Sequence, residues 1–287
     1  MITVDQALAD LFALVSVLES ETVQLRKANG RVLAETVVAN SDQPPFAASA
    51  MDGYAVSGAS ISSDKTFSVI GEAAAGHRWD GTVGPDQSVR IFTGAPLPTG
   101  TDHVIIQENV TRDGDMITLD DSANDQPYVR PAGADFKRGD QITAPRALRP
   151  SDIALFAAMN VPTVQVTRRP VVAIIATGDE LVQPGEAPRD DQIIASNSFG
   201  LAALVEDLGA RARMLPIARD NKASLELAFE LAADADLIVT IGGASVGDHD
   251  LVGDVALAKG MDRAFYKVAM RPGKPLMAGR LGQAAMI

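Results

Sequence analysis

The feature that most constrains the fold is an apolar, mostly β-branched run at Leu237–Ile241 that ends in a glycine pair and then in acidic residues. A run without polar alternation is typical of a strand that is covered on both faces of a parallel sheet. Glycines after a strand let backbone N–H groups approach an anion closely, and Ser245 adds a hydroxyl. The stretch from Gly242 to Asp250 therefore predicts a phosphate-binding loop between a strand and a helix.

Two carboxylates in this loop, Asp248 and Asp250, stand where an anion would bind. They would repel a phosphate unless a divalent cation bridges them, so the loop predicts a metal-assisted phosphate site. The spacing Gly-Gly-x-x-x-Gly matches neither a P-loop nor a dinucleotide-binding fingerprint. On these residues alone, a tight turn without a ligand is an equally good interpretation.

Composition narrows the class of protein. The net charge of -12 argues against a nucleic acid or an anionic membrane as partner, because either polyanion would be repelled. The chain has no cysteine, which excludes disulfides and thiolate chemistry. It has no N-terminal signal pattern and no apolar run long enough to span a membrane, so we expect a cytoplasmic protein. A length of 287 residues predicts two or three domains.

The first part of the chain predicts helices on either side of a β-rich region. A capping-box pattern at Thr3–Gln6 begins an amphipathic helix, and a second helix within 145–162 is expected to pack beside it. Short apolar runs between Phe67 and Thr143 alternate with Gly, Pro, Asp and Asn clusters, which indicates a small all-β domain. The loop from Asp42 to Val56 fits a plain linker, but it also carries an acid, a hydroxyl and an aromatic ring, as functional loops do.

After Pro170 the pattern changes to strands and helices in alternation, beginning with a fully apolar strand at Val171–Ala176. Predicted helices over 198–208, 223–233 and 250–259 and strands over Leu237–Ile241 and 265–268 follow. This order predicts a doubly wound parallel sheet, in which ligands bind at the carboxyl ends of the strands. Thr177–Glu180 and the glycine loop both follow such ends, which favours a functional interpretation of both.

Five short motifs occur in order along the chain. They are Pro-Pro-Phe-Ala-Ala-Ser-Ala-Met-Asp-Gly-Tyr-Ala (44–55), Thr-Gly-Ala-Pro (93–96), Thr-Gly-Asp-Glu-Leu (177–181), Gly-Gly-Ala-Ser-Val-Gly (242–247) and Arg-Pro-Gly-Lys-Pro (271–275). Together they closely resemble the molybdopterin molybdenumtransferase family, of the MoeA and gephyrin E-domain type, over essentially the whole chain. The resemblance implies molybdenum cofactor biosynthesis: divalent-cation-dependent insertion of molybdate into adenylylated molybdopterin, with release of AMP.

The resemblance also implies an α/β plus all-β multidomain fold. A helical linker region would comprise 1–45 and 140–168, an inserted small β domain 46–139, and a doubly wound molybdopterin-binding α/β domain 169–287. The family's C-terminal β-barrel domain would be absent, because the chain ends before the family's Leu-Pro-Gly-Asn-Pro motif. We therefore expect the strand near Pro275–Ala278 to lack its following partner, and the chain to bind molybdopterin but to aggregate and to fail to insert molybdenum.

The resemblance assigns site residues motif by motif. The catalytic positions would be Asp52, Thr93, Asp135, Glu180, Asp220 and Asp250, of which Asp52, Glu180 and Asp250 would hold the metal. The cofactor-binding positions would be Gly242, Gly243, Ser245, Gly247, Arg130, Lys267, Arg271 and Lys274. This division is chemically consistent, because cleavage of a phosphoanhydride needs a bridging metal and molybdate needs fixed cations.

Assembly and partners follow from the resemblance as well. It implies a homodimer that uses Mg²⁺ or another divalent cation, and we expect the site to be completed across the two-fold axis. A molybdopterin adenylyltransferase would supply the substrate, and molybdoenzymes or their chaperones would accept the product. Two alternatives stay open: a molybdopterin adenylyltransferase, which would not need residues 1–165, and a non-catalytic molybdopterin-binding scaffold.

Overall fold

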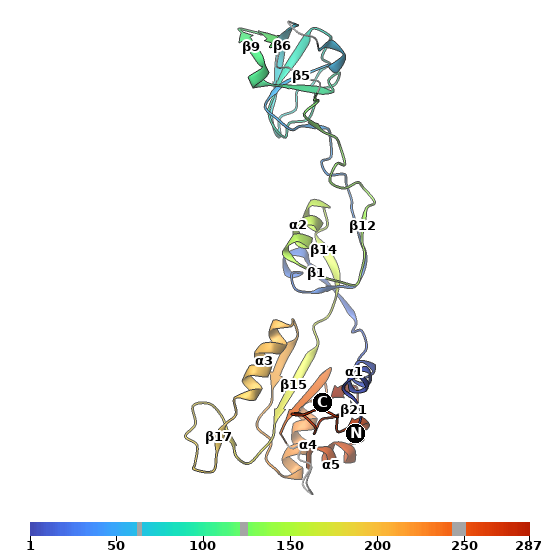
Figure 1. Ribbon diagram of the computed structural model, residues 1–287, viewed down its shortest axis with the longest axis vertical. Coiled ribbons are helices and arrows are strands. Elements are labelled where there is room, and N and C mark those ends of the chain that lie inside the picture. Colours follow the sequence, from blue (N-terminus) through green and yellow to red (C-terminus); the bar gives the residue numbers. More distant parts are fainter. Residues whose placement is uncertain (62–64, 121–125, 243–250) are drawn as a thin grey trace. The chain divides into compact units, whose positions relative to one another are not determined.

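A computed structural model describes residues 1–61, 65–120, 126–242 and 251–287 (Figure 1). The chain divides into two compact units. Unit 1 comprises Met1–Glu21, Gly30–Val32 and Gln165–Ile287, and unit 2 comprises Thr22–Asn29 and Leu33–Val164. Each unit contains a six-stranded sheet and buried apolar clusters of its own. In the part of the chain that the structure describes, no helix is long and apolar enough to cross a membrane.

Unit 1 is built around a mixed sheet with the strand order β18-β15-β19-β22-β21-β20. Its strands are β15 (Val171–Ala176), β18 (Arg211–Met214), β19 (Leu237–Ile241), β20 (Asp262–Tyr266), β21 (Met277–Leu281) and β22 (Ala284–Met286). β15 is parallel to β18 and β19, and β19 is parallel to β22, but β21 is antiparallel to both of its neighbours. The sequence predicted a wholly parallel sheet. That prediction is wrong at β21, because a tight turn joins β21 to β22 and such a turn can connect only antiparallel strands.

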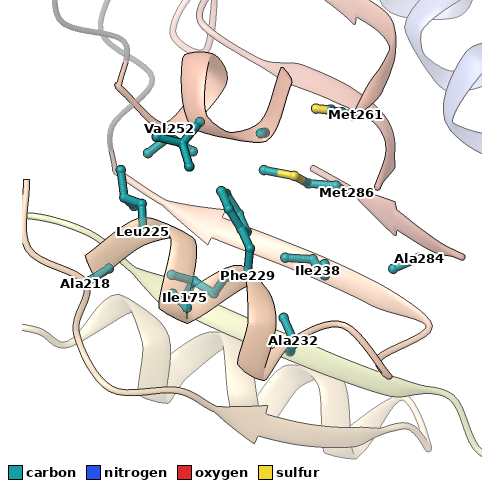
Figure 2. Close-up of a cluster of buried hydrophobic side chains, with 14 of the residues drawn as sticks. Ile175, Ala218, Leu225, Phe229, Ala232, Ile238, Val252, Met261, Ala284 and Met286 are labelled. Atoms are coloured by element: carbon teal, nitrogen blue, oxygen red, sulfur yellow. The ribbon is translucent and has the colours of Figure 1, made fainter. Parts of the chain in front are cut away.

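Helices cover both faces of this sheet. They are α1 (Val4–Ala13), α3 (Asn197–Asp207), α4 (Lys222–Leu231) and α5 (Leu251–Ala258). α3 packs on the face that carries Val172 and Ile174, whereas α4 and α5 pack on the face that carries Ile175. Figure 2 shows Phe229 of α4 and Ile238 of β19 in this second cluster. Since successive strand residues point to opposite faces, β15 is buried on both, as its unbroken apolar sequence predicts.

Strand β21 lies between β20 and β22 and pairs with both. The expectation that the strand near Pro275–Ala278 lacks its following partner is therefore wrong. β22 supplies that partner because the chain reverses at Gly282, whose φ of +61° lies in the left-handed region that glycine favours. In the described sheet the edge strands are β18 and β20.

The N-terminal helix α1 begins where the sequence predicts. Thr3 is its N-cap, and Thr3 Oγ1 accepts a hydrogen bond from Gln6 N–H at 3.2 Å. Ala7 is buried in a cluster with Phe265, Val268 and Ala278, so α1 packs on the β20–β21 side of the unit 1 sheet. The sequence instead predicts the helix within 145–162 as the packing partner of α1; that helix is α2 (Pro150–Ala158) and belongs to unit 2.

Unit 2 contains a sheet with the order β8-β5-β7-β6-β10-β9. Its strands are β5 (Gly53–Val56), β6 (Thr66–Ala73), β7 (Gln87–Ile91), β8 (His103–Ile106), β9 (Val110–Asp113) and β10 (Met116–Leu119). The pairs are antiparallel except β6 with β7. One buried cluster contains Ala55 and Val89, and another contains Tyr54 and Phe67, so apolar groups cover both faces of β5. These strands lie mainly in the stretch for which the sequence predicts a small all-β domain.

Short elements complete the described chain. They are β1 (Ser20–Gln24), β2 (Val32–Leu33), β3 (Val37–Val38), β4 (Ala48–Ser49), β11 (Val129–Arg130), β12 (Gln141–Ile142), β13 (Arg146–Ala147), β14 (Thr163–Thr167), β16 (Leu181–Val182), β17 (Ile193–Ile194) and the single turns η1 (Leu25–Lys27), η2 (Gly58–Ser60) and η3 (Gln107–Asn109). The strands form a sheet of order β1-β14-β2-β13 and the pairs β11-β4, β12-β3 and β16-β17.

Candidate functional site

The carboxyl ends of β15 and β19 lie side by side in the unit 1 sheet, and the chain leaves these two strands toward opposite edges of the sheet. After β15 the chain passes through α3 to β18 on one side, and after β19 it passes through α5 to β20 on the other. Open α/β sheets bind ligands in the crevice outside such a switch point. A cavity of about 90 Å³ opens here, lined by Ala176, Leu181, Ile241 and residues 193–198. We call this end of the sheet the switch-point edge.

Gly242 occupies a position at this edge that has no room for a side chain. Its φ is +97°, and a Cβ atom would lie 2.6 Å from the Thr177 carbonyl oxygen and 3.0 Å from Thr177 Oγ1. Thr177 itself is buried, and its N–H donates to the Ile241 carbonyl oxygen at 2.9 Å. The close approach of the two loops explains the glycine at the end of β19. The predicted loop residues Gly243, Ser245, Gly247, Asp248 and Asp250 lie outside the described residues.

The loop after β15 carries Glu180, and the loop after β18 carries Asp220. Two reciprocal hydrogen bonds of 3.4 Å join these loops, from Asp179 N–H to Asp220 Oδ2 and from Asp220 N–H to Asp179 Oδ1. Arg219 Nη1 donates to the carbonyl oxygens of Asp179 and Leu181, at 3.1 and 3.3 Å. The structure thus brings the exposed side chains of Glu180 and Asp220, both predicted site residues, to the switch-point edge.

The Glu180 carboxylate lies over Gly178. A Cβ atom at Gly178 would be 2.4 Å from Glu180 Oε2 and 2.6 Å from Oε1, and the φ of Gly178 is +148°. The main chain of Glu180 is held on its other side, because its carbonyl oxygen accepts a hydrogen bond of 2.8 Å from Ile193 N–H. A glycine at position 178 therefore leaves space for the acid two residues later.

The hairpin between β20 and β21 carries three predicted cationic residues, Lys267, Arg271 and Lys274. Backbone bonds close its neck, from Lys267 N–H to the Leu276 carbonyl oxygen at 2.9 Å and from Val268 N–H to the Lys274 carbonyl oxygen at 3.1 Å. β20 runs in the same direction as β19, so the hairpin leaves the sheet at the switch-point edge. It lies three strand positions from β19, which at the usual strand spacing is about 14 Å.

In unit 2 the structure places Asp52 against Thr93, and both are predicted site residues. Thr93 N–H and the Thr93 hydroxyl both donate to Asp52 Oδ1 at 2.8 Å. The hydrogen bond from Thr93 N–H contributes most to holding the pKa of Asp52 below its usual range, and the bond from the Thr93 hydroxyl comes next. The nearby positive charge of Arg90 acts in the same direction. Asp52 is therefore a carboxylate at neutral pH, the form that binds a cation.

Arg130 and Asp135 form an exposed ion pair, with 2.6 Å between Arg130 Nη2 and Asp135 Oδ1. The short strand β4 connects this pair to Asp52 and Thr93. Ser49 of β4 pairs with Val129, next to Arg130, and its carbonyl oxygen accepts a bond of 2.8 Å from Gly94 N–H, next to Thr93. The four predicted site residues of unit 2 therefore lie on chain segments that bond to β4 or follow it closely in the chain.

The described residues contain no group of three or more His, Asp or Glu side chains that could hold a metal ion. Of the predicted metal ligands, Asp52 belongs to unit 2 and Glu180 to unit 1, and Asp250 lies outside the described residues. Mg²⁺ is commonly held by one or two carboxylates together with substrate phosphates and water. The exposed Glu180 of unit 1 and the ionised Asp52 of unit 2 each have the oxygen chemistry of a magnesium ligand.

A larger cavity, of about 280 Å³, lies at the opposite, amino ends of β15 and β19, where Pro170 and Leu237 line it. The lining carboxylate Asp236 is already engaged: Arg168 donates to its two oxygens at 2.6 and 2.7 Å. This pairing holds the pKa of Asp236 below its usual range. Asp236 therefore has a structural partner, and the groups suited to ligand chemistry lie at the switch-point edge instead.

Two residues of the switch-point edge, Asp179 and Arg219, were missed by the sequence reasoning. Asp179 lies inside the Thr-Gly-Asp-Glu motif, so its position was an available signal. Arg219 precedes Asp220, but a single arginine in a loop forms no pattern, and its partners, Asp179 and Leu181, are about forty residues away in the chain. Only the folded chain identifies those contacts.

Comparisons with known proteins agree with this architecture. Residues 2–160 match the family described as MoeA N-terminal region (domain I and II), and residues 173–286 match the family described as probable molybdopterin binding domain. Two crystal structures of the molybdopterin biosynthesis MoeA protein from Pyrococcus horikoshii are similar to the whole chain, with TM-scores of 0.87 and 0.82 at 30% and 28% identity, and the chain covers 73% of each. The fold and the matched regions thus define a protein of the molybdopterin-binding class.

Curated relatives make the assignment more specific. The chain is 38% identical over 277 residues to a molybdopterin molybdenumtransferase from a Nostoc species, covering 93% of this chain and 64% of the relative. It is 37% identical over 288 residues to the molybdopterin molybdenumtransferase of Haemophilus influenzae, covering 99% of this chain and 71% of the relative. The chain belongs to this family of enzymes, the MoeA-type molybdopterin molybdenumtransferases, and spans about two thirds of the length of these relatives.

Proposed function

We propose that this protein inserts molybdate into adenylylated molybdopterin and releases AMP. This replaces the expectation that the chain fails to insert molybdenum, since β22 supplies the sheet partner on which that expectation partly rested. The observation that supports this most is the switch-point edge, where Gly242 lies against Thr177 and the loops after β15 and β18 carry the exposed carboxylates of Glu180 and Asp220. The cationic hairpin, residues 267–276, leaves the sheet at the same edge. Breaking a phosphoanhydride requires stabilisation of charge on the phosphate oxygens, and a dianion such as molybdate requires fixed cations. Unit 1 offers carboxylates that can hold a metal for the first task and lysine and arginine side chains for the second.

We assign the metal to carboxylates and the oxyanion to cations. Asp52, Glu180 and Asp250 would hold Mg²⁺ or another divalent cation, and Thr93, Asp135 and Asp220 would complete the catalytic set. A cation held by these carboxylates would supply stabilisation of the charge that develops on the phosphate oxygens. Thr93 keeps Asp52 ionised for this role. Gly242, Gly243, Ser245 and Gly247 would receive molybdopterin, and Arg130, Lys267, Arg271 and Lys274 would bind the anionic groups of the substrates.

We further propose the three regions 1–45 with 140–168, 46–139 and 169–287 as functional parts, acting in a homodimer. A molybdopterin adenylyltransferase would deliver the substrate, and molybdoenzymes or their chaperones would take the product. Light scattering at micromolar concentration tests the assembly, since a fully active monomer would contradict it. A cytoplasmic location remains a prediction from the sequence.

A two-arm assay tests the activity. One arm offers adenylylated molybdopterin with molybdate and Mg²⁺, and the other offers molybdopterin with ATP and Mg²⁺. We expect AMP release and a molybdenum-containing pterin in the first arm only. Adenylylation in the second arm would instead identify an adenylyltransferase, and binding without turnover in both would identify a scaffold. The match of residues 2–160 to the MoeA N-terminal region favours the first outcome, because an adenylyltransferase does not need these residues.

A further inference from the structure

We propose that Arg219 is a positioning residue that holds Glu180 and Asp220 together at the switch-point edge. The inference rests on the proposed function of these two acids, and it adds a residue to which no motif assigns a role. Arg219 Nη1 donates to the carbonyl oxygens of Asp179 and Leu181, which are the residues directly before and after Glu180. A single guanidinium therefore holds the main chain on both sides of the candidate acid.

The main chain of Arg219 is itself anchored at the start of α4. Arg219 N–H donates to Ser224 Oγ at 2.9 Å, and Ser224 N–H donates to Oδ1 of the helix N-cap Asn221 at 3.0 Å. The side chain of Arg219 thus connects a fixed point at the beginning of a helix to the loop that carries Glu180. Because Asp220 is the next residue, the same anchor sets the position of both acids.

The two loops come from different strands of a parallel sheet. Backbone bonds join their starts, from Gly178 N–H to the Ala218 carbonyl oxygen at 3.0 Å and from Ala218 N–H to the Ala176 carbonyl oxygen at 2.9 Å, so a tether matters further along, beside Glu180 and Asp220. The direct bonds between Asp179 and Asp220 are long, at 3.4 Å, and they bring two carboxylates close together. Like charges at short range repel each other, so these contacts alone hold the loops weakly. The guanidinium of Arg219 supplies both a positive charge and shorter bonds, of 3.1 and 3.3 Å.

Kinetics of AMP release from adenylylated molybdopterin measure the effect. We expect Arg219→Ala to lower kcat about 10- to 100-fold, the usual scale for a displaced catalytic group. The KM for adenylylated molybdopterin should change little, because Arg219 bonds to protein carbonyls. Arg219→Lys keeps a cation with several N–H donors and should recover part of the rate. Arg213→Ala is the matched control, since that guanidinium also bonds to a backbone carbonyl, of Leu231, but away from this edge.

A double-variant cycle with Glu180→Gln separates positioning from direct action or plain stability. If Arg219 acts through Glu180, then Arg219→Ala should cost little further rate in the Glu180→Gln background. Amide hydrogen exchange gives an activity-free readout: peptides covering 178–182 should exchange faster in Arg219→Ala but not in Arg213→Ala. Additive losses of rate in the double variant, or unchanged hydrogen exchange in these peptides, would overturn the positioning role of Arg219 but not the proposed role of Glu180. A Glu180→Gln variant with normal AMP release would overturn the proposed role of Glu180, and the positioning role together with it.

Discussion

The two units hold their candidate acids in different ways. In unit 2, the carboxylate of Asp52 receives two hydrogen bonds from Thr93, so the side chain itself is fixed and ionised. In unit 1, bonds from Arg219 and Ile193 hold the main chain around Glu180, and its carboxylate lies exposed over Gly178. An acid fixed through its side chain is organised before a ligand binds, whereas an acid fixed through its main chain can still turn toward one.

Sheet geometry explains this difference. In unit 2, β5 and β7 are antiparallel with Gly53 opposite Ile91, so Asp52 and the chain just after Ile91 leave the same end of the pair, where Thr93 bonds to Asp52. In unit 1, the strands are parallel, and the loops that carry Glu180 and Asp220 leave separate strands in the same direction. Backbone bonds between Gly178 and Ala218 and between Ala218 and Ala176 join the starts of these loops, and Arg219 connects them further along, beside Glu180.

The largest effect is expected when the fixed acid of unit 2 loses its charge. Asp52→Asn should lower AMP release at least about 100-fold, because it removes a ligand charge where a metal must stabilise phosphate oxygens. The fold should survive, since Asp52 is only half-buried. Chromatographic assay of AMP measures the loss, with the circular dichroism spectrum as the control. Near-normal release with saturating Mg²⁺ would remove Asp52 from the site.

The next effect concerns the glycine that lets the loops of unit 1 approach each other. Gly242→Ala should lower the free energy of unfolding by about 2 to 3 kcal/mol, from left-handed strain together with the clash at Thr177. Gly260→Ala is the matched control, because Gly260 has a similar φ of +90° but a Cβ atom there would meet no heavy atom within 4 Å. For this control a loss of about 1 kcal/mol is expected, from the left-handed strain alone. Equal losses in denaturant titrations would contradict the close approach of the loops.

A smaller effect should follow from crowding the acid that is fixed only through its main chain. Gly178→Ala places a methyl group against the Glu180 carboxylate, and we expect kcat to fall about 10-fold. The free energy of unfolding should also fall, by about 1 to 3 kcal/mol, because a φ of +148° is unfavourable for any residue except glycine. The contact is with the end of a flexible side chain, which can turn away at little cost. An unchanged kcat would mean that Glu180 does not act from its observed position.

The smallest effect concerns pH. Thr93→Val removes the hydroxyl that donates to Asp52 and keeps the backbone donor, so the pKa of Asp52 should rise toward its ordinary value. Because the low pKa keeps Asp52 ionised into the acid range, the acid limb of the rate profile should move to higher pH in the variant. A ¹³C NMR titration of the Asp52 carboxyl gives the same test without activity. An unshifted titration would contradict the pairing.

The sequence predicts the parts of this structure that local patterns encode. The unbroken apolar run gave β15 its bounds, and the capping box at Thr3 marked the start of α1, because burial on both faces and a side-chain cap leave direct traces in neighbouring residues. The motifs placed Glu180 and Gly242 at the strand ends. β22 has three residues, too few to show a periodic pattern of apolar side chains. Its pairing between β19 and β21 depends on strands that are distant in the sequence.

The contacts that organise the site are also long-range. Thr93 follows Asp52 by 41 residues, and Arg219 lies 40 residues from Asp179, so no spacing in the sequence marks either contact. The motifs carried by the family resemblance predict Asp52 and Thr93 as site residues without indicating which hydrogen bonds join them. Arg219 had no motif at all, and only its contacts in the folded chain distinguish it from a surface arginine.

The most direct test of the account is AMP release from adenylylated molybdopterin by the wild type, Asp52→Asn and Glu180→Gln, each with and without molybdate and Mg²⁺. The account predicts release by the wild type that depends on Mg²⁺ and is coupled to molybdenum insertion, and a large loss in both variants. Release that needs neither molybdate nor Mg²⁺, or that survives in both variants, would contradict it.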